Sequence, residues 1–220
     1  MGKHALLNAS SAHRWLTCPP LPRLENFFEK EVSEVANEGT DAHRLSEYKL
    51  RKVLSEKVRK PKLKYFDKDM DSYTDDYVNN IKKSTKDPIV LIEQRLDFSN
   101  YVPDGFGTGD CIIIADKTLH IIDLKYGRGV EVSAEENPQM MLYALGALNI
   151  YDALYDIDEV VMTIFQPRKY NISSSKKSVE ELKNWADTVL KEKAELAFNG
   201  LGVVTYGPWC QFSNCNVVLR

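Results

Sequence analysis

The sequence predicts an α/β fold in which a central mixed β-sheet is flanked by helices. Two patterns support this: β-branched apolar runs bounded by turn residues, and longer segments with apolar residues every three or four positions. The two patterns alternate along the chain, so a sheet covered by helices is their natural packing. The expected strands cover 89–98, the two arms of a hairpin within 107–126, and 159–165, and the expected helices cover 10–18, 40–58, 70–84, 138–149 and 178–198.

Local residues set the expected helix boundaries. Thr40 is a suitable N-cap for the helix over 40–58, and Pro138 suits the first turn of the helix that it opens. Ser178 and the glutamate three residues later form a capping box, and Gly200 is placed to end the helix that follows.

Length and charge indicate one domain in solution. The chain has 220 residues and a formal net charge of −3, enough length for a substantial core. Because no apolar run could span a bilayer and the first residues lack a signal-peptide core, we expect a cytoplasmic protein with no membrane partner. We expect a single domain over 1–220 with its core at about 36–198, an arm over 1–35 broken by three prolines between residues 19 and 22, and a tail over 199–220.

The predicted hairpin carries two acids and a lysine. Strand alternation places Asp110 on the same face as Ile112, and places Asp123 and Lys125 on the same face as Ile121. An acid among buried aliphatic side chains is costly unless its charge is compensated, and a divalent cation with carboxylate ligands would do so. A solvated hairpin face or a simple Asp–Lys ion pair would account for the same residues.

Two predicted helices add polar residues at helical spacing. His43 shares a stripe with Glu47 and Leu50, so it points in the same direction as the apolar face. Gln139 and Tyr143 are four residues apart and are neighbours on their helix. A helical histidine or a Gln–Tyr pair alone is more often structural, so these residues gain weight only beside the hairpin.

The ordered motifs Gly39-Thr-x-x-His43, Glu93, Gly-Thr-Gly-Asp110, Asp123-Leu-Lys125 and Gln139-x-x-x-Tyr143 resemble the PD-(D/E)XK nuclease superfamily. The resemblance covers roughly residues 36–165 and is closest to the RecB-like exonuclease branch, which includes phage-encoded and CRISPR-associated nucleases. It implies a restriction-endonuclease-like core and a metal-dependent deoxyribonuclease that hydrolyses phosphodiester bonds in phage or prokaryotic DNA processing or recombination.

The resemblance also implies a metal site. Asp110 and Asp123 would be anionic ligands, His43 a nitrogen ligand, and the Leu124 carbonyl a further ligand. Mixed nitrogen and carboxylate ligation suits Mn²⁺ better than Mg²⁺, although both are candidate cofactors. Glu93 is a candidate catalytic acid near the metal, acting indirectly or through a water molecule, and strand alternation leaves open whether it faces the solvent instead.

Other residues would act on the substrate. Lys125 would orient the attacking water or neutralise charge on the transition state, and Gln139 and Tyr143 would hold the scissile phosphate or support the lysine. Arg44 is a candidate DNA contact, with a simple exposed arginine as the alternative.

The cysteines bear on a second cofactor. Many RecB-like exonucleases hold a [4Fe–4S] cluster, and Cys18, Cys210 and Cys215 occupy positions expected of its ligands. Ser213 stands where a fourth cysteine is expected, so we do not expect an intact iron–sulfur cluster. A zinc ion held by these three cysteines and His13 is a weaker alternative, and free thiols are the preferred interpretation.

The expected partner is DNA, at single-stranded or duplex ends. A basic run over 49–64 is a candidate phosphate contact despite the negative net charge. An exonuclease is favoured over a site-specific endonuclease because no separate module for reading base edges is evident. A recombination partner protein is possible under this interpretation, and the oligomeric state stays open. The alternatives are a catalytically silent DNA-end-binding or recombination accessory protein, and a structural phage protein that uses the fold as a scaffold.

Overall fold

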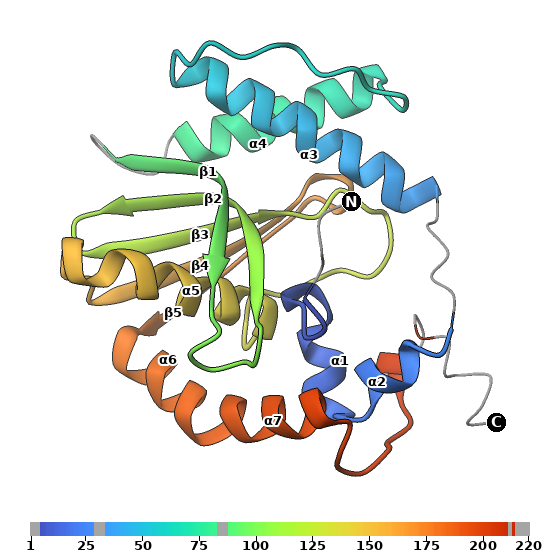
Figure 1. Cartoon of the computed structure of the whole chain (residues 1–220). Helices are drawn as coiled ribbons and strands as arrows, with labels where there is room; N and C mark the ends of the chain where they lie inside the picture. Colours follow the sequence, from blue (N-terminus) through green and yellow to red (C-terminus); the bar gives the residue numbers. More distant parts are fainter. Residues whose placement is uncertain (1–4, 29–33, 83–87, 211–212, 214–220) are drawn as a thin grey trace.

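A mixed β-sheet of five strands lies at the centre of the described part of the chain, in the order β1-β2-β3-β4-β5 (Figure 1). The computed structural model describes residues 5–28, 34–82, 88–210 and 213. Strands β3 and β4 are parallel, and the other neighbouring pairs are antiparallel. The strands are β1 (Ile89–Asp97), β2 (Phe106–Ala115), β3 (Thr118–Leu124), β4 (Glu159–Gln166) and β5 (Asn171–Ser178).

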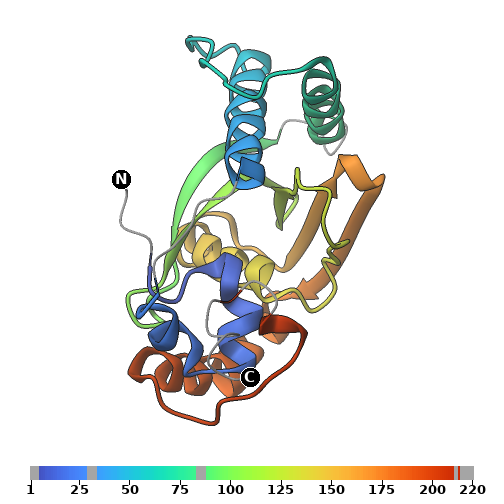
Figure 2. The ribbon, with the colours of Figure 1, turned by 90° about the vertical axis from the view of Figure 1, so that its right-hand side faces the viewer.

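Helices cover both faces of this sheet (Figures 1 and 2). Helices α3 and α4 lie side by side over one face, α5 crosses the other, and α1 and α2 pack against α7 at one end of the molecule. The α-helices are α1 (Ala12–Thr17), α2 (Leu21–Glu25), α3 (Glu34–Val53), α4 (Lys68–Lys82), α5 (Pro138–Tyr155), α6 (Val179–Trp185) and α7 (Lys191–Asn199). Shorter turns are η1 (Ala9–Ser11), η2 (Pro167–Lys169), the π-helical η3 (Ala186–Leu190) and η4 (Pro208–Cys210).

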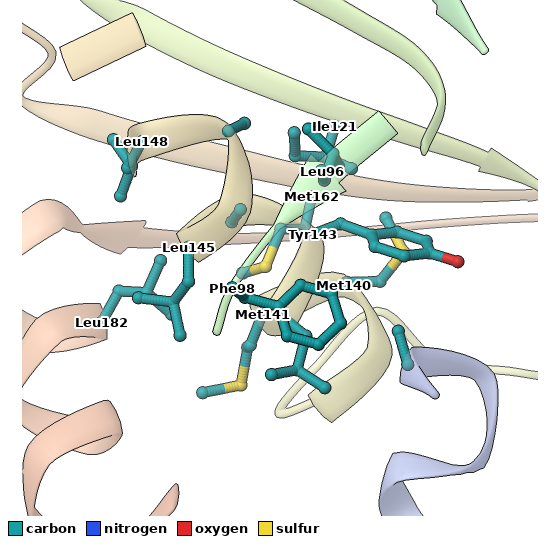
Figure 3. Packing of buried hydrophobic residues seen from close by; sticks show 14 of the residues in the cluster. Leu96, Phe98, Ile121, Met140, Met141, Tyr143, Leu145, Leu148, Met162 and Leu182 are labelled. Carbon is teal, nitrogen blue, oxygen red and sulfur yellow. The ribbon is translucent and has the colours of Figure 1, made fainter. Parts of the chain in front are cut away.

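The larger apolar core lies between the sheet and α5 (Figure 3). Met140, Tyr143 and Leu145 of α5 pack in one cluster with Leu96 of β1 and Ile121 of β3. A fully buried side chain of this size contributes roughly 1.5–3 kcal/mol relative to its exposed state. This core therefore fixes α5, with Gln139 in its first turn, against the sheet.

A second core lies on the opposite face, under α3 and α4. Leu50 of α3 and Tyr77 and Ile81 of α4 pack against Ile113 of β2 and Ile122 of β3. Because both faces of the sheet are buried, the central strands read in the sequence as continuous apolar runs.

The predicted hairpin is confirmed. Strands β2 and β3 pair from Ala115 opposite Thr118 to Cys111 opposite Ile122. The connecting residues Asp116 and Lys117 both have positive φ angles, 48° and 60°. Two such residues make the tight turn whose twist suits an antiparallel hairpin.

The two hairpin strands separate beyond Cys111. From there β2 continues beside β1 as far as Phe106, whereas β3 continues beside β4 as far as Leu124. A fork therefore opens between β2 and β3, and both Asp110 and Asp123 lie at this fork.

Helix α3 differs from its prediction. It already includes Glu34 and ends at Val53, instead of covering 40–58. Thr40 is therefore not an N-cap: it lies inside the helix, and its hydroxyl donates to the Ala36 carbonyl at 3.0 Å. The first turns of α3 were not predicted, because the seven residues before His43 are polar or small and give no apolar periodicity.

Two other predictions were wrong at the level of single elements. The prolines between residues 19 and 22 do not simply break the chain, since Pro20 is the N-cap of α2 and Pro22 lies in its first turn. Strand β5 was not predicted, because its sequence is dominated by serine and lysine and it lies at the sheet edge.

The predicted helix from 178 is confirmed in its boundaries. Ser178 and Glu181 form the capping box, and Gly200 ends α7 in the left-handed region with φ 69°. The segment is not uniform, because α6 and α7 are joined by the π-helical η3.

Hydrogen bonds join segments near the two ends of the described part of the chain. Arg23 Nε of α2 donates to the Phe198 carbonyl of α7 at 2.7 Å. Thr205 Oγ1 donates to the Thr17 carbonyl at 3.1 Å, and Trp209 packs on Leu21. Among the helices of the described residues, none is long and apolar enough to cross a membrane.

Candidate functional site

Asp110 is held at the fork between β2 and β3 by two neighbours. Its Oδ2 accepts a hydrogen bond from the Leu124 backbone N–H at 2.7 Å, a donor that β2 no longer pairs at this point. Its Oδ1 lies 3.2 Å from His43 Nδ1, and 13% of the Asp110 side chain is exposed. The strand separation thus creates a site for a carboxylate, and α3 supplies the imidazole beside it.

Glu93 joins this pair from β1. It lies between two register pairs, Ile92 with Cys111 and Gln94 with Gly109, which places it opposite Asp110. One ligand atom from each of His43, Glu93 and Asp110 lies within 4.8 Å of the others. The solvent-facing alternative for Glu93 is therefore not what the structure shows.

The backbone explains why strand alternation could not place these acids. Glu93 has φ 51°, a left-handed conformation that is uncommon for a side chain inside a strand. Ile92 belongs to the core under α3 and α4, whereas Leu96, four residues on, belongs to the core under α5. Residues four apart on a regular strand share a face, so the alternation shifts at Glu93.

The same shift occurs on β2 at Asp110. A side chain at Gly107 would meet the Tyr143 ring of α5, yet Cys111 packs in the core under α3 and α4. The prediction that Asp110 shares a face with Ile112 was wrong. Ile112 packs on the α5 side, while Asp110 reaches His43 of α3.

A second group lies beside the first and is centred on Lys125. Its ammonium lies 2.8 Å from Asp123 Oδ2 and donates to Gln139 Oε1 at 2.9 Å. Gln139 Nε2 in turn donates to Asp123 Oδ1 at 3.0 Å and contacts the Tyr143 hydroxyl at 3.3 Å. The side chain of Asn137 caps α5 by accepting from the Gln139 N–H, which fixes the position of that glutamine.

Charges in the site shift the pKa values of His43, Glu93 and Asp110. The Asp110 carboxylate raises the pKa of His43 to about 9 against the effect of burial. Burial, and then the charge of Asp110, raises the pKa of Glu93 to about 7. Burial works to raise the pKa of Asp110, but His43 and the Leu124 N–H outweigh it and hold that pKa below its usual value.

The pKa values of Lys125 and Asp123 are also shifted. Burial would lower the pKa of Lys125, but the charge and hydrogen bond of Asp123 together with the charge of Asp110 outweigh it and raise that pKa. Burial raises the pKa of Asp123, opposed by the charge of Lys125. His43 is thus a second cation beside the acids, in addition to Lys125. The site thus contains two cations and three carboxylates.

The nitrogen of His43 with the carboxylates of Glu93 and Asp110 is a donor set that fits a divalent cation such as Mn²⁺. Among the described residues this close set contains Glu93 rather than Asp123. Both Asp123 oxygens are engaged by Gln139 and Lys125, and Leu124 contacts Asp110 through its N–H. Direct ligation by Asp123 or by the Leu124 carbonyl stays a prediction.

Sequence reasoning overlooked one residue that supports the site. The guanidinium of Arg168 is buried, pairs with Glu38 of α3 at 2.9 Å, and stacks over the Tyr126 ring at 4.6 Å. It therefore ties the start of α3 to the segment after Lys125. Nothing in the sequence marks this arginine as buried, so it could not be told from an exposed basic residue.

Arg44 does not join the site. It is an exposed side chain, 58% accessible, whose guanidinium lies 3.7 Å from Asp41 Oδ1. Cys18 and Cys210 are both buried free thiols, and Cys215 lies outside the described residues. A metal on these cysteines therefore stays untested, as does the zinc alternative with His13.

The basic run over 49–64 divides into two parts. Lys49 is engaged by Asp71 and Asp75 at 2.8 and 2.7 Å, so its charge is compensated. The residues from Lys57 to Lys64 form a loop with exposed basic side chains. The N–H of Lys64 donates to the Asp41 carboxylate at 2.6 Å, so this loop returns to α3 two residues before His43.

The fold and site define an α/β protein with a partly buried histidine–carboxylate centre beside a lysine. A family model described as "Protein of unknown function (DUF2800)" matches residues 4–220, and the chain belongs to this family. The protein is also similar to a solved structure titled "Crystal structure of SSO0001", with 14% sequence identity over 94% of this chain and 95% of that chain. The TM-score of that match is 0.35, so it carries no argument.

Proposed function

We propose that the protein is a divalent-metal-dependent deoxyribonuclease of the PD-(D/E)XK type, with an exonuclease of the RecB-like branch as the favoured form. One observation carries this proposal: His43, Glu93 and Asp110 converge within 4.8 Å, and the Lys125 group lies directly beside them. These residues come from α3, β1, β2 and the end of β3, which are far apart in the sequence.

The residues present would divide the chemistry of phosphodiester hydrolysis. His43, Glu93 and Asp110 would hold the cation, which when bound polarises a phosphodiester oxygen and lowers the pKa of a water molecule. The Lys125 side chain is 28% exposed, and its ammonium is positioned by Asp123 and Gln139. It can donate to a phosphate oxygen on which negative charge develops.

A purely structural role for these charges is less consistent with Glu93. The pairs His43–Asp110 and Lys125–Asp123 would be complete without it. Glu93 adds a third carboxylate, in a left-handed backbone conformation, and its pKa is raised by burial and by Asp110. Backbone strain and a raised pKa at one carboxylate are typical of functional sites.

The finer parts of this proposal come from the resemblance. They are action at single-stranded or duplex DNA ends, a role in phage or prokaryotic DNA processing or recombination, and a cytoplasmic location. The exposed basic loop from Lys57 to Lys64 supports contact with phosphates near α3.

The test is a nuclease assay of the whole chain with Mn²⁺ or Mg²⁺ on linear and covalently closed DNA. We expect linear DNA to be degraded from its ends, with Asp110→Asn and Lys125→Met each abolishing cleavage. The matched controls are Asp152→Asn and Lys183→Met, which form a surface ion pair away from the site and should retain activity.

Two outcomes would overturn the proposal. Cleavage of closed circular DNA at defined positions would contradict the exonuclease assignment. Metal-independent binding to DNA ends with no cleavage in any divalent cation would contradict the enzyme assignment and favour a silent accessory protein.

A further inference from the structure

A cavity of about 620 Å³ opens beside the lysine group of the site. Lys125 and Gln139 line one end of it, and His13 of α1 and Trp209 of η4 also line it. Its volume falls in the range of pockets that enclose a drug-sized ligand, about 300–1,000 Å³. The mechanism proposed above uses no part of this cavity beyond Lys125 and Gln139.

Trp209 forms an ordered aromatic wall. Its indole Nε1 donates to the Thr205 carbonyl at 3.3 Å, so its polar atom is satisfied. The ring lies so close to Gly207 that any side chain there would overlap it. The ring also packs on the apolar cluster around Cys18 and Leu21, and it remains half-buried. A flat ring held on several sides is a preformed stacking surface.

The charges of the cavity favour a neutral group over a phosphate. Partial burial and the neighbouring Arg14 lower the pKa of His13, so its imidazole is neutral at pH 7. Lys125 is paired with Asp123 and is assigned to the phosphate at the metal site, and the acidic residue Glu131 also lines the cavity. Among the described residues that line the cavity there is thus no uncompensated cation, whereas phosphates bind where cations are available.

We propose that this cavity accepts one unpaired nucleobase of the DNA strand, stacked on Trp209, while the adjacent phosphodiester lies at the metal site. This inference rests on the proposed nuclease function and names the form of its substrate. A base that enters this cavity and stacks on Trp209 must first leave its partner strand, and unpairing costs least in a single strand or a frayed end. The cavity therefore favours single-stranded ends over blunt duplex ends.

Binding can be measured without cleavage by using the Asp110→Asn chain with Mg²⁺. A short single-stranded oligonucleotide should quench tryptophan fluorescence, and a blunt duplex of the same sequence should bind more weakly. Placing one abasic nucleotide at successive positions should weaken binding at one position near the end. A base–aromatic stack predicts a loss of about 5- to 150-fold there.

Trp209 variants assign the effect to this ring. Trp209→Ala should lose a similar factor in affinity, whereas Trp209→Phe should keep most of the affinity and lose most of the quenching. Trp185→Phe is the matched control because Trp185 packs beside the α5 core, away from the cavity, so quenching should persist. A thermal melt of each variant separates a loss of binding from a loss of fold.

The outcomes for the cavity and for the nuclease are distinguishable. If the native chain degrades DNA but binds abasic and intact strands equally, or binds blunt duplex as tightly as single strands, the cavity is not a base site. If the oligonucleotide quenches Trp209 and the native chain cleaves nothing, the base site stands and the nuclease function falls.

Discussion

Glu93 and Asp110 face each other across the antiparallel pair β1–β2, and Glu93 is in the left-handed region at φ 51°. Such a conformation costs of order 1–3 kcal/mol for a residue with a side chain, so the surrounding sheet must hold it. It also brings two carboxylates together beside His43. The metal-free protein is therefore destabilised locally by backbone strain and by repulsion between the carboxylates of the three residues that could hold a cation.

Replacing Glu93 should have opposite effects with and without metal. Its folded-state pKa of about 7 lies above the ordinary 4.5, so its ionised form destabilises the fold increasingly from pH 4.5 to 7 and fully above that range. At pH 8, Glu93→Gln should stabilise the metal-free chain by roughly 1–2 kcal/mol, or about 2–8 °C in a thermal melt.

The same variant should respond less to Mn²⁺. A cation that binds only the folded native chain stabilises it by roughly 2.7 kcal/mol at a hundredfold excess over its dissociation constant. Glu93→Gln and His43→Ala should both reduce this shift, while Glu159→Gln, at a surface ion pair, should leave it unchanged. A native melt that millimolar Mn²⁺ and Mg²⁺ leave unmoved would show that these residues form no metal site.

Gln139 should act by positioning Lys125 and Asp123, which it bridges. Gln139→Leu should lower the turnover of DNA about 10- to 100-fold, the usual effect of removing a group that orients a site residue. The Mn²⁺-induced melting shift should persist, because Gln139 is not in the close donor set. Tyr143→Phe should have a smaller effect, and equal losses of turnover and metal shift in Gln139→Leu would contradict this role.

His120 should make stability depend on pH. Burial lowers its pKa to about 4, and its ring is hydrogen bonded to Thr163 Oγ1 at 2.8 Å. The unfolded chain binds this proton near pH 6.5, so stability is full above that pH and is lost as the pH falls toward 4.

Between pH 7 and 5 this contribution is about 2 kcal/mol. Urea unfolding at both pH values should show a smaller decrease for His120→Gln than for the native chain by about that amount. Equal decreases in the two chains would show that His120 is not responsible.

Two glycines inside helices should respond oppositely to the same substitution. A methyl group at Gly39 of α3 would meet nothing within 4 Å, so Gly39→Ala should stabilise the fold by about 0.5–1 kcal/mol. At Gly146 of α5 it would lie 2.9 Å from the Leu96 Cβ, so Gly146→Ala should destabilise by about 1–3 kcal/mol as α5 is pushed from β1. Chemical denaturation of both variants measures the two signs, and a stabilising Gly146→Ala would contradict the packing described.

Most elements were predictable because their residues carry short-range patterns. The hairpin turn at Asp116 and Lys117 and the capping box at Ser178 depend on neighbours within a few residues, and both were found. Strand β5 lacked such a pattern: its register with β4 is supplied by the sheet and not by its own serines.

Several residues that motif order had named lie close together, but their grouping was not predictable. His43, Asp110 and Lys125 were identified from motif order. The position of the Glu93 side chain depends on one backbone angle, which the residue types around it do not reveal. Likewise, the engagement of Asp123 by Gln139 depends on how α5 packs over the sheet, which is a long-range property.

The joining of α2 to α7 has a consequence for how the chain is made. Arg23 can form its hydrogen bond only after Phe198 has been synthesised. Leu21 can be covered by Trp209 only after that residue has been synthesised. At synthesis rates of about 5–20 residues per second, roughly 10–35 s separate the emergence of these partners from the ribosome. During that interval Leu21 lacks its final cover, so the packing of α2 can be completed only after α7 and Trp209 have emerged.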